Sequence, residues 1–231
     1  MNQGLVSYFE KTNSHSRVSD MDLKDLKNLV RKGEGSQLEF KLKANHPEKI
    51  IREVVAFANT DGGTLLVGVG DDKSIPGLKF VDEEEYTLVR AIEKFCEPPI
   101  NYRLERLAIT DERDVLIFTI PQSTEKPHFV KLSATEPPKA YVRVQDRSVQ
   151  ASKEVKQILR RENEEGIRFV FGEKEKVLME YLAQHQNITL EKFAEIAKIP
   201  LWLASRTLVL LVLGHVLRVQ PNELVDTYVV Y

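Results

Sequence analysis

The stretch that decides the fold is FANTDGGTLLVGV, which runs from Phe57 to Val69. An apolar run with helical spacing ends at Asn59, an acid and two glycines follow, and the segment TLLVGV then has the pattern of a buried β-strand. Glycine permits a sharp turn and close approach of the backbone. The stretch therefore predicts a helix that turns directly into a central strand.

Three interpretations are open for the Asp61-Gly62-Gly63 turn: a phosphate-binding loop, part of a metal site, or a tight turn alone. The sequence contains neither a GxxxxGK[ST] motif nor a complete GxGxxG motif that opens a helix. Its glycines follow a helix and enter a strand, so the helix N-terminus that binds phosphate is not available to them. We therefore disfavour a nucleotide-binding loop, and the turn and the metal site remain.

The segments around this stretch predict an α+β domain. The strand predicted at residues 37–43 alternates Leu38, Phe40 and Leu42 with charged residues, so one face is expected to be buried and the other solvated. The other helices are predicted at residues 19–33, 47–59, 82–97 and 152–163, and the other strands at 64–70, 75–80, 100–109, 114–120, 128–132 and 139–145. We expect a mixed-sheet domain over residues 19–165, preceded by a flexible lead-in over residues 1–18.

The tail, residues 173–231, has a different pattern. Three helices are predicted at 173–185, 189–199 and 201–217, followed by two strands, and this order is that of a small winged helix-turn-helix domain. The third helix is apolar on nearly every side, with Arg206 as its one charged residue, and the tail has six Lys or Arg against seven Asp or Glu. Such a helix is buried or pairs with another chain. We therefore expect the tail to serve homodimerisation at least as much as DNA contact.

Composition limits the function classes. The chain has 231 residues and a formal net charge of −2, so any nucleic-acid binding must depend on a local basic patch. Cys96 is the single cysteine, which excludes an intramolecular disulfide and fits a reducing compartment. No signal-peptide pattern and no long apolar run is present. We expect a cytoplasmic protein with no membrane partner.

Five motifs in order resemble those of the Schlafen AlbA-type domain over roughly residues 20–160. They are Glu34, LEFK at 38–41, AFANTDGGTLLVGV at 56–69, PGL at 76–78, and YVRV at 141–144 followed by Ala151-Ser152. The resemblance implies an α+β domain associated with nucleic-acid binding, found in bacterial proteins that carry a winged-helix segment and are described as transcriptional regulators. Some family members have been labelled divergent ATP-binding proteins. Vertebrate Schlafen relatives use the domain as a metal-dependent ribonuclease.

The resemblance implies a set of nuclease carboxylates, which would also be the ligands of Mg²⁺ or Mn²⁺: Glu34, Glu39 and Asp61. An offset of five residues puts Glu34 and Glu39 on opposite faces of a regular strand, so they converge only if Glu34 lies in a preceding turn. Plainer alternatives stay open: a loop acid at 34, a salt-bridged strand residue at 39 and a turn acid at 61. Asp71 and Asp72 are expected in a hairpin turn.

A second set of residues predicts phosphate contacts without catalysis. These are the cations that the family fold would bring together: Lys41, Lys43, Lys49, Arg52, Arg143 and Arg147. We expect a nucleic-acid-binding protein, a dimeric transcriptional regulator that binds DNA or RNA. The alternatives are a Mg²⁺- or Mn²⁺-dependent endoribonuclease and a nucleotide-binding or protein-interaction module.

Overall fold

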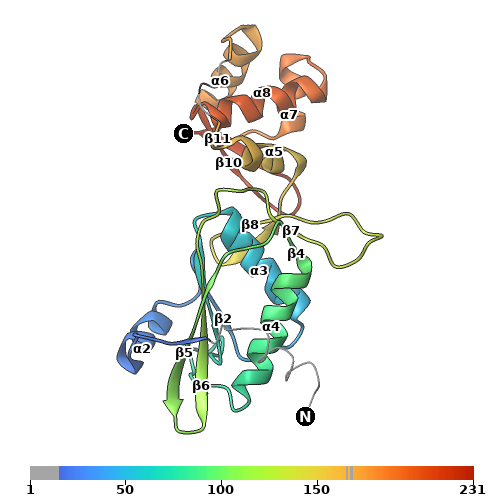
Figure 1. Ribbon diagram of the computed structural model, residues 1–231. Helices are drawn as coiled ribbons and strands as arrows, with labels where there is room; N and C mark the ends of the chain where they lie inside the picture. The colour runs from blue at the N-terminus through green and yellow to red at the C-terminus, as the bar shows by residue number, and fades with distance from the viewer. Residues whose placement is uncertain (1–15, 165, 167–168) are drawn as a thin grey trace. The chain divides into compact units, whose positions relative to one another are not determined.

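The computed structural model describes residues 16–164, 166 and 169–231 (Figure 1). These residues form two compact units. The first holds the described residues up to Ser123 together with His128–Ser148, and the second holds Thr124–Pro127 and Val149–Tyr231. The remainder of the predicted lead-in, residues 1–15, lies outside the described residues.

The first unit is built on a five-stranded mixed sheet with strand order β1-β5-β6-β3-β2. Two pairs are parallel: β2 (Leu38–Lys41) with β3 (Gly63–Val67), and β1 (Arg17–Val18) with β5 (Arg103–Thr110). The strand β6 (Arg113–Ile120) runs antiparallel to both β3 and β5. The mixed sheet confirms the predicted fold class of this domain. Residues 17 and 18, assigned to the flexible lead-in, instead form an edge strand.

Helices cover both faces of this sheet (Figure 1). On one face, α3 (Pro47–Asn59) and α4 (Val81–Phe95) pack over Leu65 and Val67, and on the other, α2 (Leu23–Lys32) packs over Leu66. Successive side chains of β3 thus enter two separate apolar cores, because a strand alternates its side chains between faces. This explains why the strand has a continuous apolar run rather than an alternating one.

The Asp61-Gly62-Gly63 turn is required by close packing. Gly62 has φ 73°, and a Cβ there would lie 2.8 Å from the backbone nitrogen of Gln122 and the carbonyl oxygen of Ile120. A Cβ on Gly63 would lie 2.4 Å from the ring of Phe57. Gly62 therefore lets the turn approach the backbone at the end of β6, and Gly63 lets β3 start directly against Phe57 of α3, as the turn interpretation expects.

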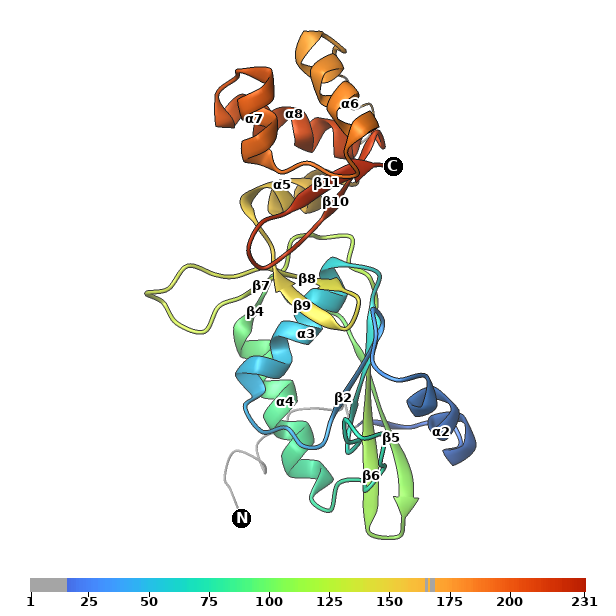
Figure 2. The same ribbon diagram turned by 180° about the vertical axis from the view of Figure 1, so that it is seen from behind.

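Smaller strand pairs complete the first unit. β4 (Cys96–Glu97) pairs with β7 (Phe129–Val130), and β8 (Tyr141–Val144) pairs with β9 (Arg147–Gln150), whose last two residues belong to the second unit. The strand β8 packs against α3 (Figure 2). The return strand predicted at 75–80 is not formed: Leu78 alone makes a bridge, to Asp114. Gly77 with φ 67° follows Pro76 and interrupts the extended backbone there.

The second unit contains helices α5 (Lys153–Arg161), α6 (Glu173–Gln184), α7 (Leu190–Ala197) and α8 (Leu201–Leu213), followed by the hairpin of β10 (Leu217–Gln220) and β11 (Thr227–Val230). The predicted boundary after residue 165 would assign α5 to the first domain. In the structure α5 lies in the second unit, where the Ser205 hydroxyl of α8 donates to Glu154 at 2.6 Å. The elements of the tail follow the predicted order, and the winged-helix interpretation stays a prediction.

Among the described residues, no single helix has the length and apolar composition needed to cross a membrane. Only α7 and α8 taken together would pass on these two criteria, and they meet at a bend of 113°.

Cys96 lies in the core of the first unit, 6% exposed, and burial raises the pKa of its thiol to about 12. Because the thiolate is the reactive form, we expect a disulfide reagent at pH 8 to label the native protein at least about a hundredfold more slowly than an unstructured thiol. Absorbance of the released thiol measures the rate, and the chain unfolded in guanidinium is the control. Native labelling at the unfolded rate would contradict the buried position.

Candidate functional site

The side chain of Arg143 is the centre of the charged residues that the sequence singled out. It extends from β8 with none of its side chain exposed. Its Nη2 atom lies 2.5 Å from Glu39 Oε2, and its Nη1 atom forms an ion pair with Glu53 of α3. Nε and Nη2 also donate to the carbonyl oxygen of Gly35 at 3.1 and 3.0 Å, and the guanidinium lies 4.9 Å from the ring centroid of Phe57. One arginine thus ties β2 and α3 to β8.

The two carboxylates are buried because they compensate this buried cation. Glu39 is 6% exposed, although strand alternation predicted a solvated position for it. Burial raises the pKa of Glu53, and the hydrogen bond that it accepts from the Ser148 hydroxyl acts in the opposite direction. A buried ion of either sign is costly without its partner. Arg143 is therefore inside the unit, and the prediction that it lies on a phosphate-binding surface is corrected.

Glu34 and Lys41 close the outer edge of the sheet. β2 is the last strand, so one side of its backbone has no neighbouring strand. Glu34 Oε1 accepts a hydrogen bond from the Phe40 N–H at 2.9 Å, and Lys41 Nζ donates to the Phe40 carbonyl at 2.8 Å while it pairs with Glu39. The Gly35 N–H donates to the Leu38 carbonyl at 2.9 Å. The Glu34 and LEFK motifs thus satisfy exposed backbone groups.

Asp71, in the loop after β3, is one of the charged groups that affect the pKa of Glu34. The pKa of Glu34 is raised, mainly by burial, with the charges of Glu39 and Asp71 acting in the same direction and the Phe40 N–H acting against them. Lys73 of the same loop donates to the Arg31 carbonyl at 3.1 Å, which holds this loop against the last turn of α2. Asp71 lies in a turn, as the sequence predicts. Its position near Glu34 could have been inferred as well, because the carboxyl ends of neighbouring parallel strands meet at one edge of a sheet.

The predicted metal ligands do not converge. In the part of the chain that the structure describes, no group of three or more His, Cys, Asp or Glu is placed to hold a metal ion. Glu39 is held by Arg143 and Lys41, and Asp61 is exposed at the turn, where its carbonyl accepts from Gln37. The residues as arranged do not fit Mg²⁺ or Mn²⁺. A catalytic role for Glu34, Glu39 and Asp61 stays a prediction.

The remaining predicted cations differ in availability. Lys43, Lys49 and Arg147 are exposed, and none of them has an ion pair within the described residues. Arg52 is half-buried, with its guanidinium 5.7 Å from the ring centroid of Tyr141 on β8. This contact places one face of α3 beside the β8–β9 hairpin. Lys43, Lys49 and Arg147 are therefore available to a ligand, and Arg52 is available only in part.

A hollow of about 490 Å³ lies beside this network, between the end of α2, the start of β2 and the end of β6. Its lining is mixed: Lys32, Gln37, Asp61, Thr64 and Thr119 contribute polar groups, and Leu29, Leu38, Ile120 and Pro121 contribute apolar surface. A Cβ on Gly35 would meet nothing within 4 Å, so this glycine faces open space. The exposed Asp61 thus lines the same hollow as Gly35 and Leu38, whose carbonyl groups accept hydrogen bonds from Arg143.

These features define a mixed α/β domain whose edge strand is tied down by a buried arginine. A family model, Schlafen, AlbA_2, matches residues 34–152, just over half of the chain. The protein belongs to this Schlafen AlbA_2 family. No curated protein matches the chain.

Two solved structures show a weaker likeness. One is the N-terminal domain of a RecG-related protein from Nitrosomonas europaea, named as a candidate ATP-dependent DNA helicase, with 21% identity and a TM-score of 0.39 over 53% of this chain and 88% of that one. The other is the DIP2311 protein from Corynebacterium diphtheriae, with 17% identity and a TM-score of 0.40 over 71% of this chain and 33% of that one.

Replacing Arg143 by Met should destabilise the protein by about 3–5 kcal/mol, because Glu39 and Glu53 would remain buried without their cation. Urea denaturation of the full chain at pH 7 measures the change. Arg147→Met is the matched control, expected within about 0.5 kcal/mol of the wild type because Arg147 is exposed. A loss below about 1 kcal/mol for Arg143→Met would show that the network does not hold the unit together.

The raised pKa of Glu53 predicts the direction of a pH effect. Above its ordinary value of 4.5 the unfolded chain releases this proton while the folded protein still binds it. The contribution of Glu53 to the free energy of unfolding is therefore fully present below pH 4.5 and is lost as the pH rises through the folded-state pKa. A carboxyl ¹³C NMR titration should give a midpoint above 4.5 for Glu53, and a midpoint at or below that value contradicts the assignment.

Proposed function

We propose that this protein binds nucleic acid through its first unit and acts as a transcriptional regulator. The observation that carries the proposal concerns three of the cations that the family fold is expected to bring together, Lys43, Lys49 and Arg147. All three are exposed and form no ion pair among the described residues. In a chain with net charge −2, a local cluster of uncompensated cations is what attracts a phosphate backbone.

The placement of these cations supports a common surface. Lys49 and Arg52 are three residues apart on α3 and so share one helix face. The contact of Arg52 with Tyr141 brings that face to β8, and Arg147 begins the strand paired with β8. Tyr141 itself is 7% exposed and is covered rather than free to stack on a base. Contacts of this kind fix a nucleic acid by its phosphates and carry no sequence information of their own.

The tail supports the regulatory part of the proposal. Its three helices and hairpin follow the order of a winged helix, and α8 exposes Leu201 and Trp202 at 54% and 64%. Exposed apolar side chains at the start of such a helix favour contact with a second copy, and dimeric regulators bind two half-sites. A cytoplasmic location belongs to the same proposal, because the one cysteine is a buried free thiol.

The test compares two triple variants of the full chain in fluorescence anisotropy with labelled duplex DNA and single-stranded RNA. The first replaces Lys43, Lys49 and Arg147 by Gln, and the control replaces Lys24, Lys27 and Arg31, which are exposed on α2 across the sheet. Removing three phosphate contacts should lower the slope of log affinity against log salt by about 2–3 and weaken binding at least about tenfold at low salt. The control triple should bind as the wild type does.

Two results would oppose the proposal: no binding of either probe at low salt, or equal losses in both triple variants. The same samples decide the ribonuclease alternative. Cleavage of the RNA with Mn²⁺ that disappears in Asp61→Asn would favour a metal-dependent nuclease, and this variant leaves the ion pairs of Glu39 intact.

A further inference from the structure

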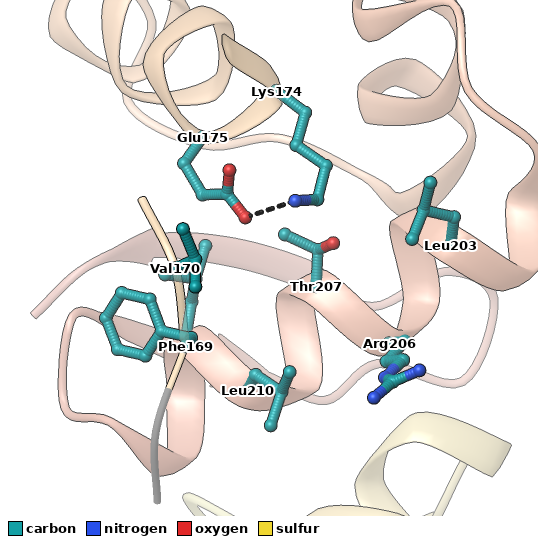
Figure 3. Close-up of a pocket in the computed structure, with 9 residues that line it drawn as sticks. Phe169, Val170, Lys174, Glu175, Leu203, Arg206, Thr207 and Leu210 are labelled. Atoms are coloured by element: carbon teal, nitrogen blue, oxygen red, sulfur yellow. Dashed lines mark ion pairs between the residues drawn. The ribbon is translucent and has the colours of Figure 1, made fainter. Parts of the chain in front are cut away.

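The second unit contains a pocket of about 720 Å³ that no part of the proposed function uses (Figure 3). It lies between the segment at Phe169-Val170, the first turn of α6 and one side of α8. Its volume is within the range of small-molecule sites in proteins. The pocket lies outside residues 34–152, so it belongs to the tail of this chain and not to the family domain.

The walls of the pocket are apolar and held in place. Leu203, Leu210 and Leu211 line it from α8, and Phe169 and Val170 line it from the segment that precedes α6. A Cβ on Gly214 would lie 2.7 Å from the Phe169 ring, so the glycine at the end of α8 lets this ring pack directly against the helix. The apolar body of a ligand would thus meet a preformed surface.

The polar groups of the pocket favour an anion. Lys174 and Glu175 pair with each other at 2.7 Å and so largely cancel (Figure 3). Arg206 is exposed and has no ion pair among the described residues, which leaves one net positive charge. Thr207 is 4% exposed, and its hydroxyl makes no hydrogen bond in the described part of the chain. The hydroxyl can therefore donate to an acceptor bound in the pocket.

We propose that this pocket binds a small organic carboxylate with an apolar body. The Arg206 guanidinium matches a carboxylate in shape and charge, and the Thr207 hydroxyl is a further hydrogen-bond donor among the residues that line the pocket. The apolar part of the ligand lies against Phe169, Leu203 and Leu210. Because the ligand would contact both α8 and the segment before α6, binding stabilises the packing of the second unit.

The experiment titrates ¹⁵N-labelled full-length protein with 3-phenylpropionate and, as the neutral match, 3-phenylpropan-1-ol. We expect saturable amide shifts at Val170, Lys174, Thr207 and Leu210 with the acid, and at least about tenfold weaker binding of the alcohol. Arg206→Gln should weaken the acid at least about tenfold and leave the alcohol unchanged. Thr207→Val, which keeps the side-chain shape, should weaken the acid about threefold or more.

Arg218→Gln is the control, since Arg218 is an exposed arginine of the same unit whose guanidinium lies over the Tyr231 ring and not in the pocket. Three results overturn the proposal. One is no saturable shift up to about 10 mM acid, where even about −0.3 kcal/mol per non-hydrogen atom would be visible. Another is equal affinity for acid and alcohol with no effect of Arg206→Gln. The third is binding of an amphipathic helical peptide here with none of the acid, which would make the pocket a protein-docking groove.

Discussion

The first unit depends on one buried interaction, the guanidinium of Arg143 between two carboxylates. Glu39 and Glu53 come from β2 and α3. The arginine comes from β8, 104 residues after Glu39 and 90 residues after Glu53. An arginine with no exposed side chain must satisfy its donors inside the protein, and six hydrogen bonds reach five residues: Gly35, Leu38, Glu39, Glu53 and Ser148. Since a buried charge is tolerated only with its partners in place, these three elements have to assemble together.

The contacts of Glu34 and of the LEFK segment at residues 38–41 give these charged residues a structural role. Glu34 and the LEFK segment have the spacing of a candidate catalytic site, yet in the structure their charged groups satisfy the open edge of β2. An edge strand whose backbone groups are capped by its own side chains is protected from pairing with another chain. The carboxylates of Glu34 and Glu39 are thereby committed to partners within the first unit.

The two units present different chemistry. The first exposes lysine and arginine side chains, whereas the second exposes apolar side chains around α8 and contains a pocket with apolar walls and one uncompensated arginine. A phosphate backbone and a small amphipathic anion would thus be recognised by separate parts of the chain. Each surface is complete within its own unit.

The sequence by itself determined most of the local structure: the helix at 47–59, the glycine turn into β3, the helical tail and its hairpin, and membership of the family through motifs in order. These follow from periodicity and from the backbone freedom of glycine, which act over a few residues. Tertiary structure alone decided that Glu39 is buried, that Arg143 is its partner, that Asp71 rather than Asp61 acts on Glu34, and that residues 75–80 form no strand. Strand alternation predicts that a charged residue such as Glu39 faces solvent. Glu39 is buried because the tertiary structure places Arg143 of β8 beside it, and this contact between distant segments cannot be read from the local sequence.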